Sequence, residues 1–174
     1  MSLGPPVIVM VMGVASSGKT TVAQGLAAAL GWPFRDADSF HPPANVAKMS
    51  AGIPLQDADR WPWLDAIADW MAAQAREGIS AVVTCSALKR AYRDRLRAAK
   101  GADQPINLRL VHLHGTQALL AARIAARTAH FMPPALLESQ FRTLEVPGPD
   151  EGAITISVEN SREMIIAELV KTFG

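Results

Sequence analysis

The sequence has little of several features that would place a protein in a special class. It has one cysteine in 174 residues, so no internal disulfide can form. No apolar run approaches the roughly 20 residues of a membrane-spanning helix, and the chain does not begin with a signal-peptide pattern. The formal net charge is only +1, which gives no reason to expect nucleic acid as a partner. We therefore expect no membrane, no nucleic acid and a cytoplasmic location.

The composition that remains is that of an ordinary globular protein. Hydrophobic residues make up 49% of the chain and charged residues 19%, which is enough apolar material for a substantial core. The lone Cys85 ends an apolar run, which favours a buried, unreactive thiol over a nucleophile. We expect one domain over residues 1–174.

Short apolar runs rich in β-branched residues alternate with longer segments of helical periodicity. The predicted strands are residues 7–12, 33–36, 80–85, 107–113 and 153–158. The predicted helices include residues 19–30, 89–100, 116–126 and 161–172. This alternation predicts an α/β fold with a five-stranded, mostly parallel sheet flanked by helices.

Two proline-rich segments interrupt this alternation. Residues 37–78 and 127–150 each contain four prolines. Loops that leave the carboxyl edge of a parallel sheet are where ligands bind in such folds. We therefore expect residues 37–78 to form a substrate cap and residues 127–150 a lid.

A phosphate-binding motif follows the first predicted strand. Residues 13–20 read GVASSGKT and match the Walker A pattern G-x-x-x-x-G-K-[ST], with a helical segment directly after them. Glycines let the backbone wrap around phosphate oxygens, so that N–H groups and the helix N-terminus face the anion. Lys19 is expected to reach the β and γ phosphates of ATP, and the Thr20 hydroxyl to ligate Mg²⁺. The predicted nucleotide-binding residues here are Gly13, Val14, Ala15, Ser16, Ser17, Gly18, Lys19, Thr20 and Thr21.

Two acidic residues follow the second predicted strand. The strand at residues 80–85 ends without the acid that motors and GTPases usually carry, which directs attention to Asp36 and Asp38. Alternate residues of extended backbone share a face, so both carboxylates should point toward the space above Lys19. One could then hold magnesium while the other accepts a proton from an attacking hydroxyl. Turn formation or helix capping explains the two acids equally well from position alone.

Longer patterns resemble those of the gluconokinases, a family of the shikimate-kinase-like P-loop group. Residues 36–64 read DADSFHPPANVAKMSAGIPLQDADRWPWL, and the resemblance continues in CSALKRAYRD at 85–94, RIAARTAHFM at 123–132 and LLESQFRTLEVP at 136–147. Together these stretches extend the resemblance over about residues 8–147. The family's P-loop commonly has glycine and serine at the positions of Ala15 and Ser16, and glycine at the position of Ala129.

The resemblance implies transfer of phosphate from ATP to the 6-hydroxyl of D-gluconate by a dimeric cytoplasmic enzyme of carbohydrate acid catabolism. We assign Asp36, with Thr20, to magnesium and Asp38 to the gluconate hydroxyl, although the sequence does not decide which acid has which role. His41 is expected to contact substrate, with packing against Pro42 as the alternative.

Basic residues are expected to bind the gluconate carboxylate. Lys89 and Arg93 are four residues apart on a predicted helix, and Lys48 and Arg60 would add contacts from the cap. A solvated basic face is the alternative, and we prefer it for Arg95, Arg97 and Lys100.

Arg123 and Arg127 are also four apart and would share one helical face before the predicted lid. There they could cover the transferred phosphoryl group, with Arg127 acting in catalysis beside Lys19 and Asp38; two exposed arginines are the alternative. His130 and Gln140 lie within the resemblance and are expected to contact gluconate, although a core or surface role is nearly as well supported.

Two other functions compete with this interpretation. A kinase for another small hydroxy acid, such as shikimate, would also place paired acids after the second strand, but it would have a glycine-rich turn where residues 85–88 read CSAL. A non-catalytic nucleotide-binding module is the second alternative. It would bind ATP without transferring phosphate.

Overall fold

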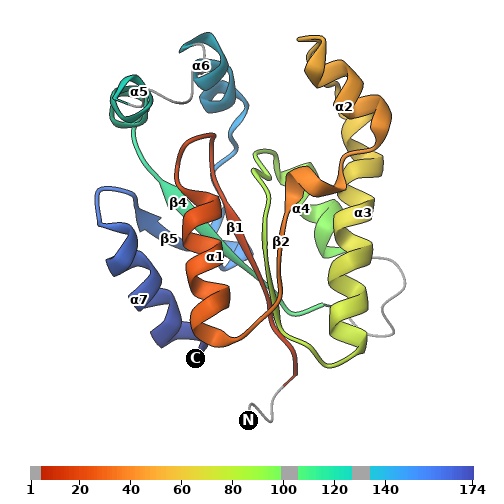
Figure 1. Ribbon diagram of the computed structural model, residues 1–174, viewed down its shortest axis with the longest axis vertical. Coiled ribbons are helices and arrows are strands. Elements are labelled where there is room, and N and C mark those ends of the chain that lie inside the picture. The colour runs from red at the N-terminus through yellow and green to blue at the C-terminus, as the bar shows by residue number, and fades with distance from the viewer. Residues whose placement is uncertain (1–4, 99–105, 127–133) are drawn as a thin grey trace.

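The computed structural model describes residues 5–98, 106–126 and 134–174, and a parallel sheet lies at its centre (Figure 1). The strands are β1 (Ile8–Met12), β2 (Phe34–Asp36), β3 (Ala81–Thr84), β4 (Leu108–His114) and β5 (Ile154–Ser157). Their order in the sheet is β2-β3-β1-β4-β5, and each neighbouring pair is parallel. The predicted five-stranded α/β fold is confirmed.

The central strand β1 shows why the apolar runs predicted the sheet so well. All five of its residues are fully buried, and Ile8 pairs with Ala81 on one side and Leu108 on the other. A parallel strand covered on both faces must be apolar at every position rather than at alternate ones. A continuous run of this kind is therefore recognisable in the sequence.

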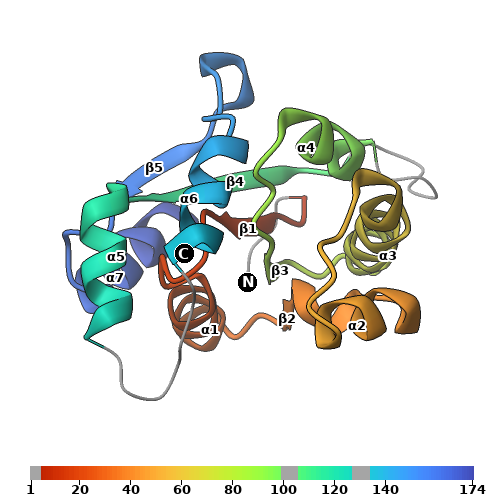
Figure 2. The same ribbon diagram turned by 90° about the horizontal axis from the view of Figure 1, so that it is seen from above.

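The described helices lie on both faces of the sheet and, for α2 (Pro43–Ser50), beyond its carboxyl edge (Figure 1). They are α1 (Lys19–Leu30), η1 (Ala37–Phe40), α2 (Pro43–Ser50), α3 (Asp57–Arg76), α4 (Arg90–Arg97), α5 (Gln117–Ala125), α6 (Pro134–Thr143), η2 (Pro149–Glu151) and α7 (Arg162–Phe173). Helices α3 and α4 pack in one core with alternate residues of β1, while α1, α5, α6 and α7 contribute to the core on the other face (Figure 2).

The segment expected to form a cap has two parts. Helix α2 lies beyond the carboxyl edge of the sheet, whereas α3 runs along one sheet face (Figure 1). Leu64, Ile67 and Met71 of α3 are fully buried in the core. Much of this segment therefore belongs to the helical layer on one face of the sheet, and only its first part extends beyond the carboxyl edge. In the segment expected to form a lid, residues 127–133 lie outside the described residues, and α6 is its main described element.

Candidate active site

The loop between β1 and α1 adopts a conformation that only glycine suits at two positions. Gly13 has φ +147° and Gly18 has φ +95°. A Cβ added at Gly13 would lie 2.8 Å from the Leu113 carbonyl oxygen and 2.9 Å from the Ser17 hydroxyl oxygen. The two motif glycines are thus required by the backbone path itself.

Polar groups in this loop are arranged for an anion. The Ser17 hydroxyl is buried and has no hydrogen-bond partner among the described residues, and Gly18 begins α1 at its positive end. The Lys19 ammonium donates to the Gly13 and Val14 carbonyl oxygens, both at 3.0 Å. Burial lowers the pKa of Lys19, while Cys85, Asp38 and Asp36 oppose that change. An unpaired buried hydroxyl and a helix N-terminus are groups that a phosphate would satisfy.

The Asp36 carboxylate both caps a turn and contacts the P-loop, which were the structural and the functional interpretations of this acid. Its carboxylate accepts from the Asp38 backbone N–H at 2.9 Å, which caps η1, and from the Thr20 hydroxyl at 3.0 Å. Turn chemistry and contact with the P-loop therefore occur in the same side chain. Asp38 lies next along the same turn.

These groups meet in one cavity of about 410 Å³. Its lining includes Lys19, Thr20, Asp36 and Asp38, together with four further residues of interest, His41, Arg60, Cys85 and Gln140. Burial raises the pKa of the Cys85 thiol to about 12, so this side chain is an uncharged part of the wall, as expected. The cavity can hold a cation and two carboxylates around a reacting phosphoryl group.

His41 is both packed and exposed to this cavity. Its ring stacks on Trp63 with the centroids 4.4 Å apart and the planes 9° apart. The Nδ1 atom lies 3.2 Å from the Asn45 amide nitrogen, and the Trp63 indole N–H donates to the Ala37 carbonyl oxygen at 2.8 Å. Burial lowers the pKa of His41 against the opposing charge of Asp38. A neutral, fixed imidazole is therefore presented at the cavity wall.

A second cavity of about 790 Å³ shares Arg60, Trp63 and Gln140 with the first. Lys89 lines only this second cavity. Asp57 lies 3.3 Å from both Arg60 and Lys89 and accepts a hydrogen bond from the Tyr92 hydroxyl, all of which lower its pKa, with Tyr92 having the largest effect.

The role of Asp57 was not recognised from the sequence, because an acid before Arg60 and Pro62 is also what a helix start requires. No signal local to those residues separates the two uses. The structure separates them because Lys89, 32 residues away in the sequence, ends beside the same carboxylate.

Gln140 joins the P-loop to the far wall of both cavities. Its side-chain oxygen, carried by α6, accepts from the Ala15 backbone N–H at 2.6 Å. The Ala15 N–H is one of the loop amides expected to face phosphate. Gln140 thus lies at the boundary between the nucleotide side and the acceptor side.

The structure does not bring Arg93 to either cavity, contrary to the expectation that it binds a substrate carboxylate. Its guanidinium is fully buried, pairs with Glu151 and donates to the carbonyl oxygens of Ala87, Leu88 and Glu145. The prediction assumed that Lys89 and Arg93 share a helical face. Helix α4 begins only at Arg90, so Lys89 precedes the helix as its N-cap and points elsewhere.

Lys48 is also held away from the cavities. Its ammonium lies 2.8 Å from an Asp59 carboxylate oxygen, and Asp59 in turn accepts from the Gln56 N–H at the start of α3. Neither cavity has Lys48 in its lining. Lys48 therefore links α2 to α3 through Asp59, and the structure does not support the expected substrate contact.

Arg123 lies at a third cavity, of about 330 Å³, on the other side of the P-loop. Its guanidinium donates to the Val158 carbonyl oxygen, and Ser17, Asn160 and Arg162 share the lining. This position is beside the loop after β5 rather than over Asp38. The expected partners Arg127 and His130 lie outside the described residues.

The fold and the loop together define a class. A Walker A loop follows β1, and two acids at the end of the edge strand β2 line the same cavity as its lysine. This arrangement is the site of a small-molecule P-loop kinase. The AAA domain family matches residues 8–147. A shikimate kinase from Aquifex aeolicus is 16% identical with a TM-score of 0.56, covering 95% of this chain and 94% of that one, which shows a common fold alone.

Closer relatives narrow the class. A gluconokinase from Gluconobacter oxydans (strain 621H) is 52% identical over 97% of this chain and 92% of its own length. The crystal structure of a gluconokinase from Sinorhizobium meliloti 1021 is 44% identical with a TM-score of 0.79, covering 97% of this chain and 95% of that one. The chain belongs to the gluconokinase family.

Proposed function

We propose that this protein transfers the γ-phosphoryl group of ATP to the 6-hydroxyl of D-gluconate, giving 6-phospho-D-gluconate and ADP. The observation that carries the proposal is the single cavity shared by Lys19, Thr20, Asp36 and Asp38, in a chain of the gluconokinase family. The reaction requires a phosphate cradle and a proton acceptor at one place. The lysine of the Walker A loop and two carboxylates line this cavity, which supports the proposal.

The P-loop is assigned to the nucleotide phosphates. The loop amides and the Ser17 hydroxyl would receive phosphate oxygens, and Lys19 would exchange its two loop carbonyls for the β and γ phosphates. The Ala15 N–H would become available when Gln140 moves from it. Lys19 would then offset the charge that develops on the transferred group.

Magnesium is assigned to the oxygens of Thr20 and Asp36, which are 3.0 Å apart. The described residues contain no group of three or more His, Cys, Asp or Glu side chains that could hold a metal by themselves. Magnesium commonly uses one or two protein oxygens and completes its shell with water and phosphate, so this donor set fits it. When bound, the ion would offset phosphate charge.

Asp38 is assigned as the proton acceptor for the 6-hydroxyl. Asp36 already accepts from Thr20 and from the Asp38 N–H. The Asp38 carboxylate, in contrast, forms no hydrogen bond or ion pair with the other described residues, and it lines the cavity with Lys19. The freer carboxylate is the better candidate for a base, since it has unused acceptor capacity.

The carboxylate end of gluconate is assigned to the second cavity. Arg60 and Lys89 line this cavity and share Asp57 as an ion-pair partner. We assign Gln140 and His41 to the hydroxyls along the chain of the substrate, because both line the first cavity. Charge-assisted hydrogen bonds of this kind give both affinity and orientation. Contact of Arg123 and Arg127 with the transferred phosphoryl group, and of His130 with gluconate, stays a prediction.

A homodimer in the cytoplasm is proposed on the resemblance to the family. No helix of the described ranges combines the length and apolar character needed to cross a bilayer. Light scattering coupled to size-exclusion chromatography measures the oligomeric state directly, and a mass of one chain would contradict the dimer.

A coupled assay tests the function. Purified protein with ATP and Mg²⁺ is supplied with D-gluconate, shikimate, other sugar acids or buffer, and ADP formation is followed. We expect turnover with gluconate well above all other additions. Turnover with gluconate no higher than with shikimate or buffer would contradict the proposal, and ATP binding without transfer to any acid would support the non-catalytic module.

A further inference from the structure

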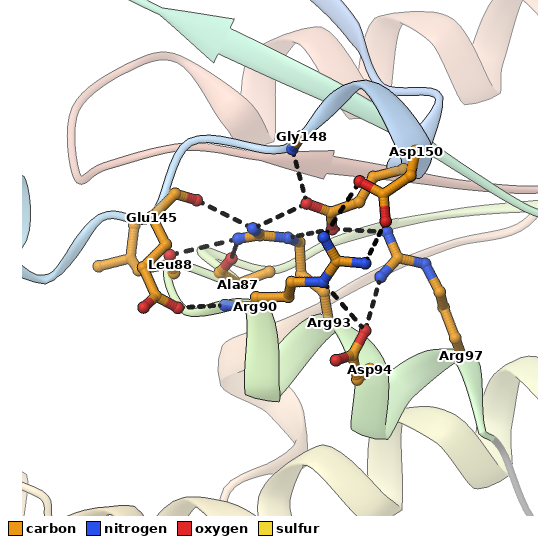
Figure 3. A network of polar contacts seen from close by, with 10 residues as sticks. Ala87, Leu88, Arg90, Arg93, Asp94, Arg97, Glu145, Gly148 and Asp150 are labelled. Atoms are coloured by element: carbon orange, nitrogen blue, oxygen red, sulfur yellow. Dashed lines mark hydrogen bonds and ion pairs between the residues drawn. The ribbon is translucent and has the colours of Figure 1, made fainter.

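A buried network of charged side chains lies behind the active-site wall (Figure 3). Arg93 of α4 is at its centre, and its side chain and that of Glu151 have relative exposures of 0% and 1%. The guanidinium donates from Nε and Nη2 to the Glu151 carboxylate at 2.7 and 3.1 Å. An ion pair so completely removed from water must be matched by hydrogen bonds to persist.

The remaining donors of Arg93 hold backbone rather than substrate. Nη1 donates to the carbonyl oxygens of Ala87 and Leu88 at 2.8 and 3.2 Å, and Nη2 to that of Glu145 at 2.9 Å. With the two bonds to Glu151, these use all five N–H groups of a guanidinium. No N–H group is left for a ligand. Any effect of Arg93 on a ligand must therefore come through the two backbone segments whose carbonyl oxygens it binds.

The first of these segments, residues 85–89, forms part of the active-site wall. Ser86 lines both large cavities, and Lys89 lines the second. Ala87 has φ +46°, a left-handed conformation that is unfavourable for alanine and that needs support from its surroundings. The Ser86 carbonyl oxygen also accepts from the Gly13 N–H of the P-loop at 3.4 Å. This one long hydrogen bond is a weak link to the P-loop, so the main effect of Arg93 on this segment is on the acceptor wall.

The second segment is the end of α6 with the two residues that follow it, Leu144 and Glu145. The Glu145 N–H donates to the Leu88 carbonyl oxygen at 2.7 Å, and its carboxylate accepts from the Arg90 N–H at 2.7 Å. Helix α6 carries Gln140, which contacts the P-loop. Arg93 thus fastens the end of α6 to the loop that forms the facing wall.

Glu151 holds Arg93 in this position from η2. Its carboxylate accepts from Arg93, from Arg97 at 2.7 Å and from the Gly148 N–H at 2.9 Å. These hydrogen bonds, that of Arg93 foremost, lower the pKa of Glu151 to about 2. The carboxylate is therefore charged throughout the ordinary pH range, and the network does not change with physiological pH.

We infer that Arg93 is a positioning residue of the kinase reaction: with Glu151 it sets the separation between residues 85–89 and the end of α6, the two walls between which the acceptor binds. The inference rests on the proposed gluconate kinase activity. It differs from the carboxylate-binding role expected from the sequence, because Arg93 touches neither cavity.

Two variants with different losses test this inference. Arg93→Lys keeps a cation for Glu151, but an ammonium has three N–H groups and cannot make the five hydrogen bonds of the guanidinium. Glu151→Gln keeps Arg93 and its bonds to Ala87, Leu88 and Glu145. We expect Arg93→Lys to lower kcat/KM for gluconate by about tenfold or more, because small displacements of a substrate wall are costly. Its KM for ATP should change by less than about twofold, and Glu151→Gln should have the smaller effect on gluconate.

Arg95→Gln is the matched control. Arg95 lies on the same helix but pairs with Asp65 at the surface, with side-chain exposures of 44% and 50%. Its kinetic constants should equal those of the wild type. If Arg93→Lys does not fold, the double variant Arg93→Met with Glu151→Leu replaces the pair by apolar side chains, a change that proteins often tolerate, and it lacks the same carbonyl hydrogen bonds.

Hydrogen–deuterium exchange makes the test independent of the substrate. In the Arg93 variant that folds, residues 85–89 and 139–145 should exchange about tenfold faster than in wild type, while β1 should not change. Unchanged exchange in those segments overturns the inference. So do unchanged gluconate kinetics, or equal losses for gluconate and ATP. Wild-type protein that does not phosphorylate gluconate contradicts the proposed function instead, and the exchange result then still decides whether Arg93 positions the two walls.

Discussion

Lys19 and Arg93 are both basic side chains near carboxylates, yet their surroundings differ. At Arg93 all five donors have partners within the protein. Around Lys19 the Ser17 hydroxyl lacks a described partner, and Asp38 faces a cavity. A cation whose hydrogen bonds are complete holds the protein together, whereas one beside unmet acceptors and donors is available to a ligand. A nearby carboxylate alone does not distinguish a cation that could bind a ligand from a structural one.

The largest expected effect comes from removing the proposed base. Asp38→Asn should lower kcat by about 10²- to 10⁴-fold, the range that general acid–base catalysis contributes. Nucleotide affinity, measured by calorimetry, should be nearly unchanged, because the P-loop is intact. Asp69→Asn, an exposed position on α3, is the control. A variant that keeps more than about a tenth of the activity would contradict a base at this position.

Removing the phosphate-site cation should have the next largest effect. We expect Lys19→Met to lower kcat by about 10²- to 10³-fold, since one preorganised donor to the transition state has about this value. Unlike Asp38→Asn, it should also weaken nucleotide binding. Lys171→Met on α7 serves as the matched control. If the two lysine variants had the same kcat and the same nucleotide affinity, Lys19 would not be the phosphate-site cation.

Lys89 and Lys48 allow a second comparison of a basic residue at a cavity with one that is not. Each has a carboxylate partner, but Lys89 lines the second of the two large cavities and Lys48 lines neither. Lys89→Met should raise the KM for gluconate by about tenfold, the value of a charge-assisted hydrogen bond, and leave the KM for ATP unchanged. Lys48→Met should change neither constant by more than about twofold. A larger effect at Lys48 would restore it as a substrate contact.

The smallest effect is a pH dependence of stability near the Arg93 network. Burial, then His114 and Arg93, lowers the pKa of His112 to about 4 from its usual 6.5. The unfolded chain therefore takes up a proton before the folded one, so the free energy of unfolding should fall as the pH drops from about 6.5 to about 4. One histidine contributes at most about 1.4 kcal/mol per pH unit.

Urea denaturation at pH 7 and pH 5 measures this dependence. His112→Leu removes the titrating group from its buried position, and its stability should change less between the two pH values than that of the wild type. Equal changes in the two proteins would mean that another group carries the dependence.

Much of the fold could be predicted because its signals are local. The strand predicted at residues 7–12 differs from β1 by one residue, since a buried parallel strand is apolar throughout. The P-loop was equally clear, because its glycines are required by backbone angles within the loop itself. The place of α3 was less clear, since prolines near its start suggested an excursion while its buried face packs on the sheet.

The candidate site was predicted in part. Asp36, Asp38, His41, Arg60 and Gln140 do line the cavity with Lys19. Arg93 and Lys48 do not, although they fall in the same family patterns. Side chains of one residue type within one motif can face ligand or core, and a pattern of letters does not say which.

The sequence by itself determined the sheet, the phosphate loop and the family, because periodicity, glycine geometry and motif spacing act over a few residues. Only the tertiary structure decided which partners each basic side chain has. Helix α4 begins one residue later than its spacing suggested, which separates Lys89 from Arg93. The partner of Arg93 is Glu151, 58 residues further along the chain, and only folding brings the two together. The hydrogen-bond partners of a charged side chain decide whether it can bind a ligand, and partners distant in the sequence do not appear in a local pattern.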